Sequence, residues 1–591
     1  MSIITSKFKS DNATKLKQDF IDSNYYVFAS STKITETINS DYSINEYVEN
    51  ALFGKKINPN EVFFMVNNIR WTYGAVYSQY DDRLDLSQEN FYAIVYPSDN
   101  NTGDYRVYKC ISNNHGTQSI NAPNYDPDTD NQLYRMGDGY VWKFMYAITP
   151  VEYKKYAALR YVPIIYPSTP ITNITSNGSL ITFTADNDFV PGMVATVRGA
   201  EPTQFNITDR AIVSATPSSF TVSGTETGVY VESGAICLIK NVPVNKKSID
   251  HIEVENYNLN TGYELKSGII EEVGENNITI YDASLSLSEI SNYYSGQSFY
   301  VISPNNTANL YTIDKYSYNI STKKAIVTLI DKDSFIEKNF NFEIFPKIEI
   351  DGDGSGAIGI PKINELGTIE SILMLDSGSG YSRAVARVVT PLYGFDTQSS
   401  LSVDVEAILR PILSPEKGHG YNIEYELISS RLHVYSEITD TDNLFIPSTN
   451  VYTKIGLIKD PTFSSNTAPE LFDNRLKITL DSNVLDVGDI VTQNISGKIT
   501  FSAEVHEVDG NDVYLCNYHG PYQNYNIEGY SDIPIDIARP LIAPQGQIMI
   551  INNIVRPEYI QKTGDVYYAT NFPPITRTST SNEEYKIILE F

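Results

Sequence analysis

Short β-branched segments separated by turn residues recur along most of this chain, and they constrain its fold more than any other feature. From about residue 168 onward they return at a spacing of roughly 8–12 residues, which is typical of antiparallel β-sandwiches and barrels. Helical periodicity nearly vanishes over the same region. The sequence therefore predicts a mainly β, multi-domain protein of antiparallel β-sandwiches, with a few short helices mostly near the N-terminus.

The N-terminal part is the least repetitive. Short helices are predicted after Asp11, where Leu16 and Phe20 would share one face, and over residues 44–53 and 151–159. Strands are predicted at residues 62–66, 91–96, 105–110 and 140–148. Turns rich in Asp, Asn and Gly separate them, so we expect one N-terminal domain of β structure with short helices.

Changes in composition divide the chain into five expected regions. Their boundaries are 1–167, 168–245, 246–350, 351–440 and 441–591. The second is a small β domain with strands predicted at residues 180–184, 193–197 and 219–222. The third is a further β region, and the last is a β domain that ends on the strand 585–591.

The fourth region contains hairpins that end in Gly-Tyr. Three copies of an apolar strand followed by such a turn run over residues 252–263, 369–381 and 408–421. We expect each glycine to supply a positive-φ turn and each tyrosine to cover it. The irregular spacing is typical of a reused hairpin and not of a solenoid.

The net charge excludes several classes of partner. The 591 residues include 44 Lys and Arg against 72 Asp and Glu, which gives a charge of −28. A chain this acidic neutralises few phosphates, so neither nucleic acid nor an anionic membrane surface is an expected partner. We expect no secretory signal and no membrane-spanning segment, and hence folding in a cytoplasm.

Two motifs resemble ligand sites, and we interpret both as turns. Residues 354–359 fit the GxGxxG spacing of dinucleotide-binding loops, with Asp376 near the expected acidic position, but no amphipathic helix follows them. Residues from Asp351 imitate the start of a calcium loop, whose twelfth position is Lys362 in place of the required glutamate. We expect no cofactor and no metal site.

Signatures of catalysis are missing from the sequence. It contains no GxSxG elbow, CxxC motif or P-loop. The three cysteines are too scattered for a disulfide framework, and we expect small thiols, buried or half-exposed, at Cys110, Cys237 and Cys516. Histidines that do not pair at i, i+4 are expected at the surface or in turns: His115, His251, His419, His433, His506 and His519. We predict no catalytic residues and no enzyme, although sequence spacing leaves a catalytic carboxylate pair open.

Tyrosine is unusually frequent, with 44 occurrences. Its apolar ring and polar tip suit protein–protein interfaces. They suit half-buried strands equally well, so composition leaves both interpretations open.

Five stretches carry a resemblance to a known family. They are residues 68–82, 90–114, 138–146, 414–427 with 455–461, and 564–588. Their signatures include Asn68-Ile69-Arg70-Trp71, Tyr108-Lys109-Cys110-Ile111, Trp142-Lys143-Phe144 and Gly418-His419-Gly420-Tyr421. In this order they resemble the baseplate wedge subunit encoded by gene eight of T-even-like contractile-tailed bacteriophages, especially the cyanophage type.

The resemblance implies a structural subunit of the phage tail baseplate, located in the virion and assembled in the host cytoplasm. It implies a homodimer that joins other wedge proteins around a hub and transmits the conformational change that triggers sheath contraction. Fibre-attachment proteins are further candidate partners. Residues 168–350 look inserted relative to the shortest family members, and we expect their outer faces to contact other subunits less than the terminal parts do.

Two other classes of function are weaker interpretations. A tail-associated glycan-binding or depolymerising protein is the alternative, because tyrosine-rich β surfaces stack on sugars. Such proteins often have long β-helical repeats, which the irregular Gly-Tyr spacing does not supply. An oxidoreductase that uses the glycine motif is a third class, and it lacks the helix that its cofactor needs.

Overall fold

The fold is taken from a computed structural model of the chain. It describes residues 5–30, 51–99, 102–124, 133–243, 247–282, 287–389, 405–438, 454–465, 467–495, 497–519, 535–560, 563–571 and 582–591. Within these ranges the protein is mainly β, with many antiparallel sheets and three α-helices, so the predicted fold class is confirmed. None of the helices in these ranges combines the length and apolar character needed to cross a bilayer.

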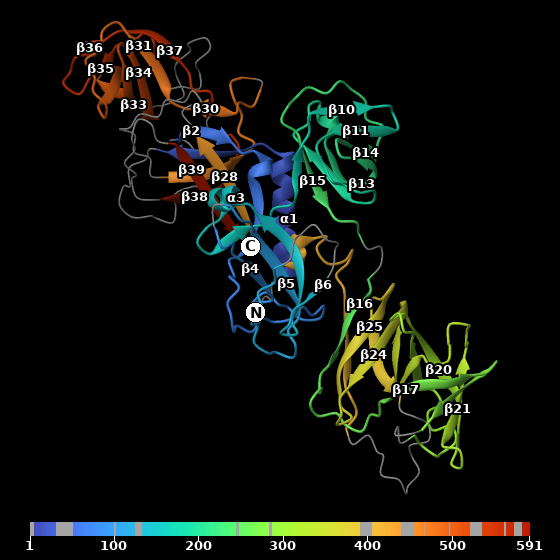
Figure 1. Ribbon diagram of the computed structural model, residues 1–591. Helices are drawn as coiled ribbons and strands as arrows, with labels where there is room; N and C mark the ends of the chain where they lie inside the picture. The colour runs from blue at the N-terminus through green and yellow to red at the C-terminus, as the bar shows by residue number, and fades with distance from the viewer. Residues whose placement is uncertain are drawn as a thin grey trace.

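Both ends of the chain contribute strands to one central body (Figure 1). Its five-stranded sheet has the order β30–β2–β1–β29–β38, with strands at Leu471–Asp473, Ala51–Lys56, Tyr25–Ser30, Lys454–Lys459 and Asp565–Asn571. Its four-stranded sheet has the order β39–β28–β3–β8, with strands at Glu583–Glu590, Arg431–Ile438, Val62–Asn67 and Tyr161–Pro163. Segments of the expected regions 1–167 and 441–591 therefore share the same sheets.

Helix α1 (Ser6–Asp22) packs against these sheets. The Thr5 side chain caps it by accepting a hydrogen bond from Phe8 N–H, so the helix begins before the predicted start at Asp11. Leu16 and Phe20 are buried on one face, as predicted. The predicted helix over residues 44–53 is wrong at its described end, because Ala51 to Phe53 belong to β2, where pairing with β1 overrides local preference. Residues 44–50 lie outside the described ranges.

The third sheet of the body leads into a helix. Its order is β4–β5–β7–β6, with strands at Tyr92–Val95, Tyr105–Ser112, Val141–Ile148 and Leu133–Arg135. Helix α3 (Pro150–Tyr156) follows β7 and starts with a capping box between Thr149 and Glu152. The strands predicted at residues 105–110 and 140–148 are confirmed, and the helix predicted at 151–159 is confirmed over residues 151–156.

A small β module comes after β8 in the sequence. Its seven strands have the order β10–β11–β14–β13–β12–β15–β9 and lie at Asn173–Ser176, Leu180–Thr184, Ser219–Ser223, Ile207–Thr216, Val194–Arg198, Ile236–Lys240 and Ser168–Pro170. The rings of Phe183 and Phe220 stack at 5.0 Å in its own hydrophobic core. The 3₁₀ turn η2 (Thr203–Phe205) also contributes a buried ring to that core.

The described residues between 247 and 413 form an extended arm. Three strand pairs make its base: β16 with β27, β23 with β26 and β24 with β25, at Ile249–Val254, Leu409–Leu413, Lys347–Gly352, Ala384–Val389, Ser355–Ile363 and Ile369–Ser379. Its tip is a closed barrel with the order β17–β18–β21–β20–β19–β22, at Lys266–Val273, Asn277–Tyr281, Lys324–Ile330, Ala308–Asn319, Ser298–Ile302 and Asn341–Phe345. The barrel lies at the outer end of the arm (Figure 1).

The first two Gly-Tyr turns share the hydrophobic core at the base of the arm, and the third lies where the chain leaves the arm. Gly262, Gly380 and Gly420 have φ angles of +95°, +83° and +83°, which an L-residue with a side chain rarely adopts. The tyrosines that follow them are all buried: Tyr263, Tyr381 and Tyr421. The predicted positive φ is confirmed, but the predicted hairpins are wrong. The strands on either side of the first two turns, β16 with β17 and β25 with β26, lie in different sheets, and the third copy leads into α4 (Ile423–Glu426).

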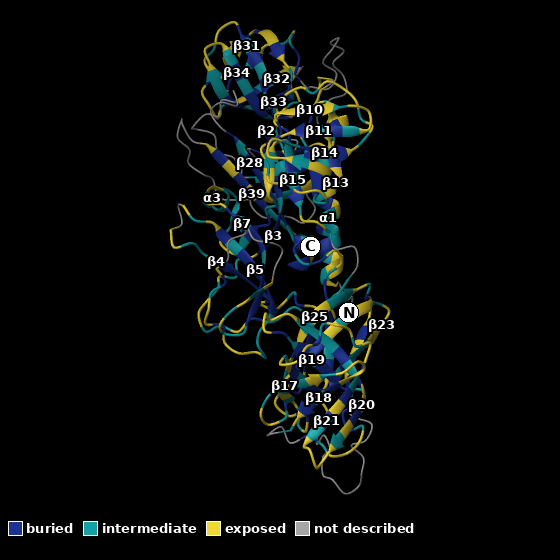
Figure 2. Ribbon diagram, turned by 45° about the vertical axis from the view of Figure 1, so that its right-hand side comes forward, coloured by how far each residue is buried: buried dark blue, intermediate teal, exposed yellow. Residues whose placement is uncertain are grey.

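The C-terminal module lies at the opposite end of the molecule from the arm (Figure 2). Its seven strands have the order β36–β35–β32–β33–β34–β31–β37 and lie at Ile548–Met549, Leu541–Ile542, Ile490–Ile495, Lys498–Asp509, Asp512–His519, Leu476–Leu480 and Ile551–Val555. It has its own core of aliphatic residues around Phe501. The described residues between 476 and 555 therefore form a unit that extends from the body. The strands before and after this unit, β30 and β38, belong to the five-stranded sheet of the body.

Candidate functional site at the joint between body and arm

The arm meets the body at a joint that the chain crosses twice. It enters the arm at β16 and leaves it at β27, and these two strands pair with each other. Five ionisable side chains meet at this joint, and we call them the joint cluster: Lys109, Asp250, His251, His419 and Glu426. β5 supplies the lysine, β16 supplies the aspartate and its neighbouring histidine, and α4 supplies the glutamate.

Lys109 is the centre of the joint cluster. Its Nζ lies 3.0 Å from Glu426 Oε2, and the exposed fractions of the two side chains are 0% and 4%. The other carboxylate oxygen of Glu426 accepts a hydrogen bond of 2.7 Å from Gly420 N–H. Burial lowers the pKa of Lys109, and the glutamate opposes that shift. The two residues therefore form a desolvated ion pair in which each side chain neutralises the charge of the other.

A histidine connects this ion pair to the arm. Lys109 Nζ lies 3.2 Å from His419 Nδ1, and His419 Nε2 lies 3.0 Å from Asp250 Oδ1. Because a carboxylate only accepts hydrogen bonds, His419 donates from Nε2 and accepts from the lysine at Nδ1. The second oxygen of Asp250 lies 3.0 Å from His251 Nδ1. A continuous series of hydrogen bonds thus runs from β5 of the body to β16 of the arm.

Burial and hydrogen bonding act in opposite directions on the two carboxylates. Burial alone would raise the pKa of Asp250, but the two histidines beside it hold that pKa well below its ordinary value. Burial likewise opposes ionisation of Glu426, whereas the Lys109 ammonium lowers the pKa of this carboxyl. Both groups are therefore ionised although they are buried, and their charges depend on the neighbours named here.

Tyr80 brings an aromatic ring to the same joint. The ring centroid lies 3.9 Å from Lys109 Nζ, and the ring meets that of His419 edge-on at 5.1 Å. The tyrosine hydroxyl donates a hydrogen bond of 3.2 Å to the carbonyl of Leu413, the last residue of β27. One side chain of the body thus contacts both the buried cation and the strand by which the chain leaves the arm.

Arg410 forms a second group of charges across the joint. It lies on β27, pairs with Asp81 of the body and with Glu253 of β16, and its Nε lies 2.9 Å from Glu255 Oε1. Burial would lower the pKa of this guanidinium, but the surrounding carboxylates raise it. The arm is therefore attached to the body by two separate sets of ionic contacts.

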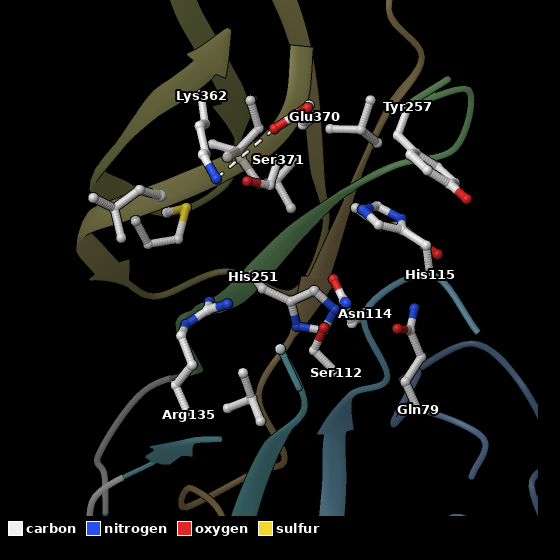
Figure 3. A pocket seen from close by; sticks show the side chains of 18 of the residues that line it. Gln79, Ser112, Asn114, His115, Arg135, His251, Tyr257, Lys362, Glu370 and Ser371 are labelled. Carbon is white, nitrogen blue, oxygen red and sulfur yellow. Dashed lines mark ion pairs between the residues drawn. The ribbon is translucent and has the colours of Figure 1, made fainter. Parts of the chain in front are cut away.

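A cleft of about 660 Å³ opens beside the joint cluster, between the body and the base of the arm (Figure 3). Asn114 and His115 line its body side, and Tyr257 and Glu370 line its arm side. The His115 and Tyr257 rings stack at 3.7 Å with an interplanar angle of 17°. This stack is a third contact between body and arm, and burial lowers the pKa of the histidine within it.

The contacts within the joint cluster determine what it can do chemically. The charged ends of Lys109, Asp250 and Glu426 all have partners inside the protein, and the lysine has no exposed surface at which a substrate could reach its amine. Across the described ranges, no three His, Cys, Asp or Glu side chains are arranged to hold a metal ion. The arrangement is suited to holding the arm on the body in one orientation.

The two ligand-like motifs lie in β structure. The glycines of residues 354–359 lead into and form part of β24, which is followed by β25 and not by a helix. Asp353 accepts hydrogen bonds from the backbone N–H groups of Ser382 and Arg383, and Lys362 pairs with Glu370 at 3.8 Å. The interpretation as turns holds for residues 353 and 354, which lie between β23 and β24, whereas Gly356 and Gly359 lie within β24.

The structure revises what was expected of the histidines. His433 on β28 and His506 on β33 are buried, although they were predicted at the surface or in turns. Each lies on a strand with a neighbour on both sides in its sheet, which sequence spacing does not reveal. The buried positions predicted as one option for the three cysteines are confirmed for Cys110, Cys237 and Cys516.

Four of the five stretches singled out in the sequence analysis meet at this joint. They supply, in chain order, Tyr80, Lys109, Lys143, and His419 with Glu426. Sequence reasoning named Lys109, Lys143 and His419 within these stretches but did not connect them to one site, because the ion pair joins residues 317 positions apart. A usable signal was present: each lysine interrupts an apolar strand. A scan of protein-family models and a search of curated proteins return no match to this chain.

Proposed function

We propose that this chain is a structural subunit of the tail baseplate wedge of a contractile-tailed bacteriophage. The observation that carries the proposal is the convergence of four wedge-like stretches on one buried cluster at the joint. These stretches are far apart in the sequence but meet in space, where they form a single structural element. That element fixes the arm to the body, so its task is mechanical and requires no reaction.

The physical chemistry of the joint suits such a task. Removing one partner of a buried ion pair destabilises a protein by about 3–5 kcal/mol, so the joint resists small disturbances. A cluster of this kind adopts a few discrete conformations and not a continuous series of intermediate ones. An intermediate with half-broken contacts would leave a charge buried without a partner. A subunit built in this way would hold one geometry until a large force acts and would then transmit the change to its neighbours.

The proposal includes a homodimer and assembly with other wedge proteins around the hub. The net charge of −28 keeps free subunits dispersed, so association depends on matching local surfaces. The arm and the C-terminal module lie at opposite ends of the molecule (Figure 2). We propose no catalytic activity.

Co-assembly tests this function directly. The chain is purified alone and after co-expression with the other wedge proteins of the same phage, and masses are measured by mass photometry. We expect twice the chain mass of 66.3 kDa for the protein alone and a larger complex after co-expression. A protein that stays monomeric and joins no wedge complex contradicts the proposal. Turnover of a bacterial capsular glycan by the purified chain would favour the glycan-depolymerising alternative.

A further inference from the structure

A second cavity of the body, which we call the tyrosine groove, lies beside α3. It has a volume of about 790 Å³ and is lined by ten residues from β4, β5, α3 and the segments next to them. Three of these are Tyr96, Tyr105 and Tyr153, and Leu159 lies at its edge. Helix α3 lies on the outside of the body (Figure 2). The groove is thus a surface feature separate from the joint.

The floor of the groove is rigid. The rings of Tyr105 and Tyr153 stack at 3.8 Å and are nearly parallel, and Tyr96 meets the first of them edge-on at 5.0 Å. The hydroxyls of Tyr96 and Tyr153 lie 2.9 Å apart, and both also bond to the Asn68 side chain. A surface whose aromatic side chains are already fixed loses little entropy when a partner binds to it.

The edge of the groove exposes apolar side chains. Leu159 exposes 94% of its surface, more than any other large apolar side chain in the described ranges. Val151, at the start of α3, exposes 75%. Because the capping box and Pro150 fix where α3 begins, the outward position of Val151 is built into the fold. Two exposed apolar side chains beside an aromatic floor form a surface that a protein partner can cover.

Three cations lie at the groove or next to it. Lys154 lines it, the guanidinium of Arg70 lies 4.7 Å from the Tyr96 ring, and Arg160 follows Leu159 directly. None of these three cations has an ion-pair partner among the residues that the structure describes, whereas the neighbouring Lys155 pairs with Glu61 at 2.9 Å. No lining residue is acidic.

We propose that the tyrosine groove docks a segment of another protein in which carboxylates flank apolar side chains. The apolar side chains cover Leu159, Val151 and the tyrosine floor, and the carboxylates pair with the unpartnered cations. Tyrosine and arginine are enriched at the energetically dominant positions of protein interfaces. A second copy of this chain does not fit, because a two-fold contact at the groove would place like charges opposite each other.

The identity of the partner rests on the proposed function, whereas its chemistry rests on the groove alone. On that basis the partner is another protein of the baseplate. Two variants remove the two kinds of contact: Leu159→Asp on the apolar edge, and the double variant Lys154→Glu/Arg160→Glu among the cations. Matched controls on the arm are Leu366→Asp, at a leucine exposed to 82%, and Lys338→Glu, at an exposed lysine.

The first measurement is co-assembly with the other wedge proteins, followed by titration and mass photometry. We expect each groove variant to weaken association at least tenfold and each control to change it less than twofold. If the wild-type chain assembles and the groove variants assemble equally well, the groove inference is wrong while the proposed function stands.

The second measurement does not depend on the baseplate. The probes are two fluorescein-labelled twelve-residue peptides, one alternating Leu with Asp and the other alternating Leu with Lys, each titrated against the full chain by fluorescence anisotropy. We expect the acidic peptide to bind at least tenfold more tightly than the basic one and to lose that preference in Lys154→Glu/Arg160→Glu. Equal binding of both peptides, no binding, or an unchanged preference in the variant overturns the inference.

Discussion

Lys109 and Glu426 lie 317 positions apart in the chain, yet their charged groups meet at 3.0 Å in a place that solvent does not reach. The lysine comes from a strand of the body and the glutamate from the short helix that follows the arm. Since His419 links the lysine to Asp250 on the first strand of the arm, this ion pair is the centre of the connection between the two parts.

The first prediction concerns the partner of the buried lysine. Glu426→Gln keeps the shape of the side chain but leaves the Lys109 charge without a counterion, and we expect a loss of about 3 kcal/mol in the free energy of unfolding. Urea unfolding followed by tryptophan fluorescence measures it, because both tryptophans, Trp71 and Trp142, lie in the body.

Two further variants make this test specific. Glu590→Gln breaks a pair with Arg431 in which the glutamate side chain is 57% exposed, and it should cost less than about 1 kcal/mol. The double variant Lys109→Met/Glu426→Leu removes both charges and should recover most of the loss. If the double variant is as unstable as Glu426→Gln, the ion-pair explanation is wrong.

The second prediction concerns how firmly the arm is held. Asp250→Asn removes the charge that both His419 and His251 contact, so we expect local opening at the joint to become more frequent. Hydrogen–deuterium exchange should speed up about tenfold or more in β16 and β27, while the barrel at the tip of the arm keeps its protection. Asp351→Asn, at an exposed aspartate of the arm, is the control and should leave β16 unchanged. Faster exchange throughout the arm would indicate general destabilisation instead.

The third prediction is a loss of stability in mild acid. Burial lowers the pKa of His433 from 6.5 to about 4, so the unfolded chain binds this proton more tightly than the folded protein does. Stability is therefore complete above a pH of about 6.5, falls as the pH drops, and levels off below a pH of about 4, with a total loss of about 3 kcal/mol from this residue. His506, whose pKa burial lowers to about 3, acts in the same direction.

Replacing the histidine isolates its contribution. Both ring nitrogens of His433 are buried without a hydrogen-bond partner in the described ranges, so Phe should be tolerated there. The His433→Phe variant should match the wild-type chain in urea at pH 8 and exceed it at pH 5 by about 2 kcal/mol. Identical pH dependence in the two proteins would show that this histidine does not titrate as described.

The fourth prediction concerns close packing within the five-stranded sheet. Gly456 on β29 lies opposite Phe28 of β1, and an added Cβ would overlap that ring and approach the Tyr568 carbonyl oxygen to 2.6 Å. We expect Gly456→Ala to cost about 2 kcal/mol in the same urea experiment, because the ring has no free space to move into. Gly137→Ala, where the nearest atom is at 3.6 Å, should change stability by less than about 0.5 kcal/mol.

Several features of the fold were predictable because they depend on neighbouring residues. The strands at residues 105–110 and 180–184 follow from β-branched and aromatic composition between turns. The positive φ of Gly380 follows from the Gly-Tyr turn, since only glycine adopts that conformation without strain. The prediction of a helix near Phe53 was wrong because its outcome depends on a distant partner. A short apolar run fits a helix or a strand equally well until the strand that pairs with it is known.

The candidate site was less accessible to sequence reasoning. A lysine between Tyr108 and Cys110 marks an unusual strand position, but nothing nearby in the sequence shows which carboxylate neutralises it. Asp250 and His251 lie outside all five family-like stretches, so the resemblance did not point to them either. The histidines of β28 and β33 were expected at the surface because burial on an inner strand depends on which strands flank it.

The sequence by itself determined the mainly β class, the acidic charge and the turn conformations. Each of these follows from composition or from residues a few positions apart. Only the tertiary structure decided that the two ends of the chain share sheets and that Lys109, His419 and Asp250 form one hydrogen-bonded series. The physical reason is that β pairing and charge burial bring together groups hundreds of residues apart, and the strength of their interaction depends on distance and desolvation.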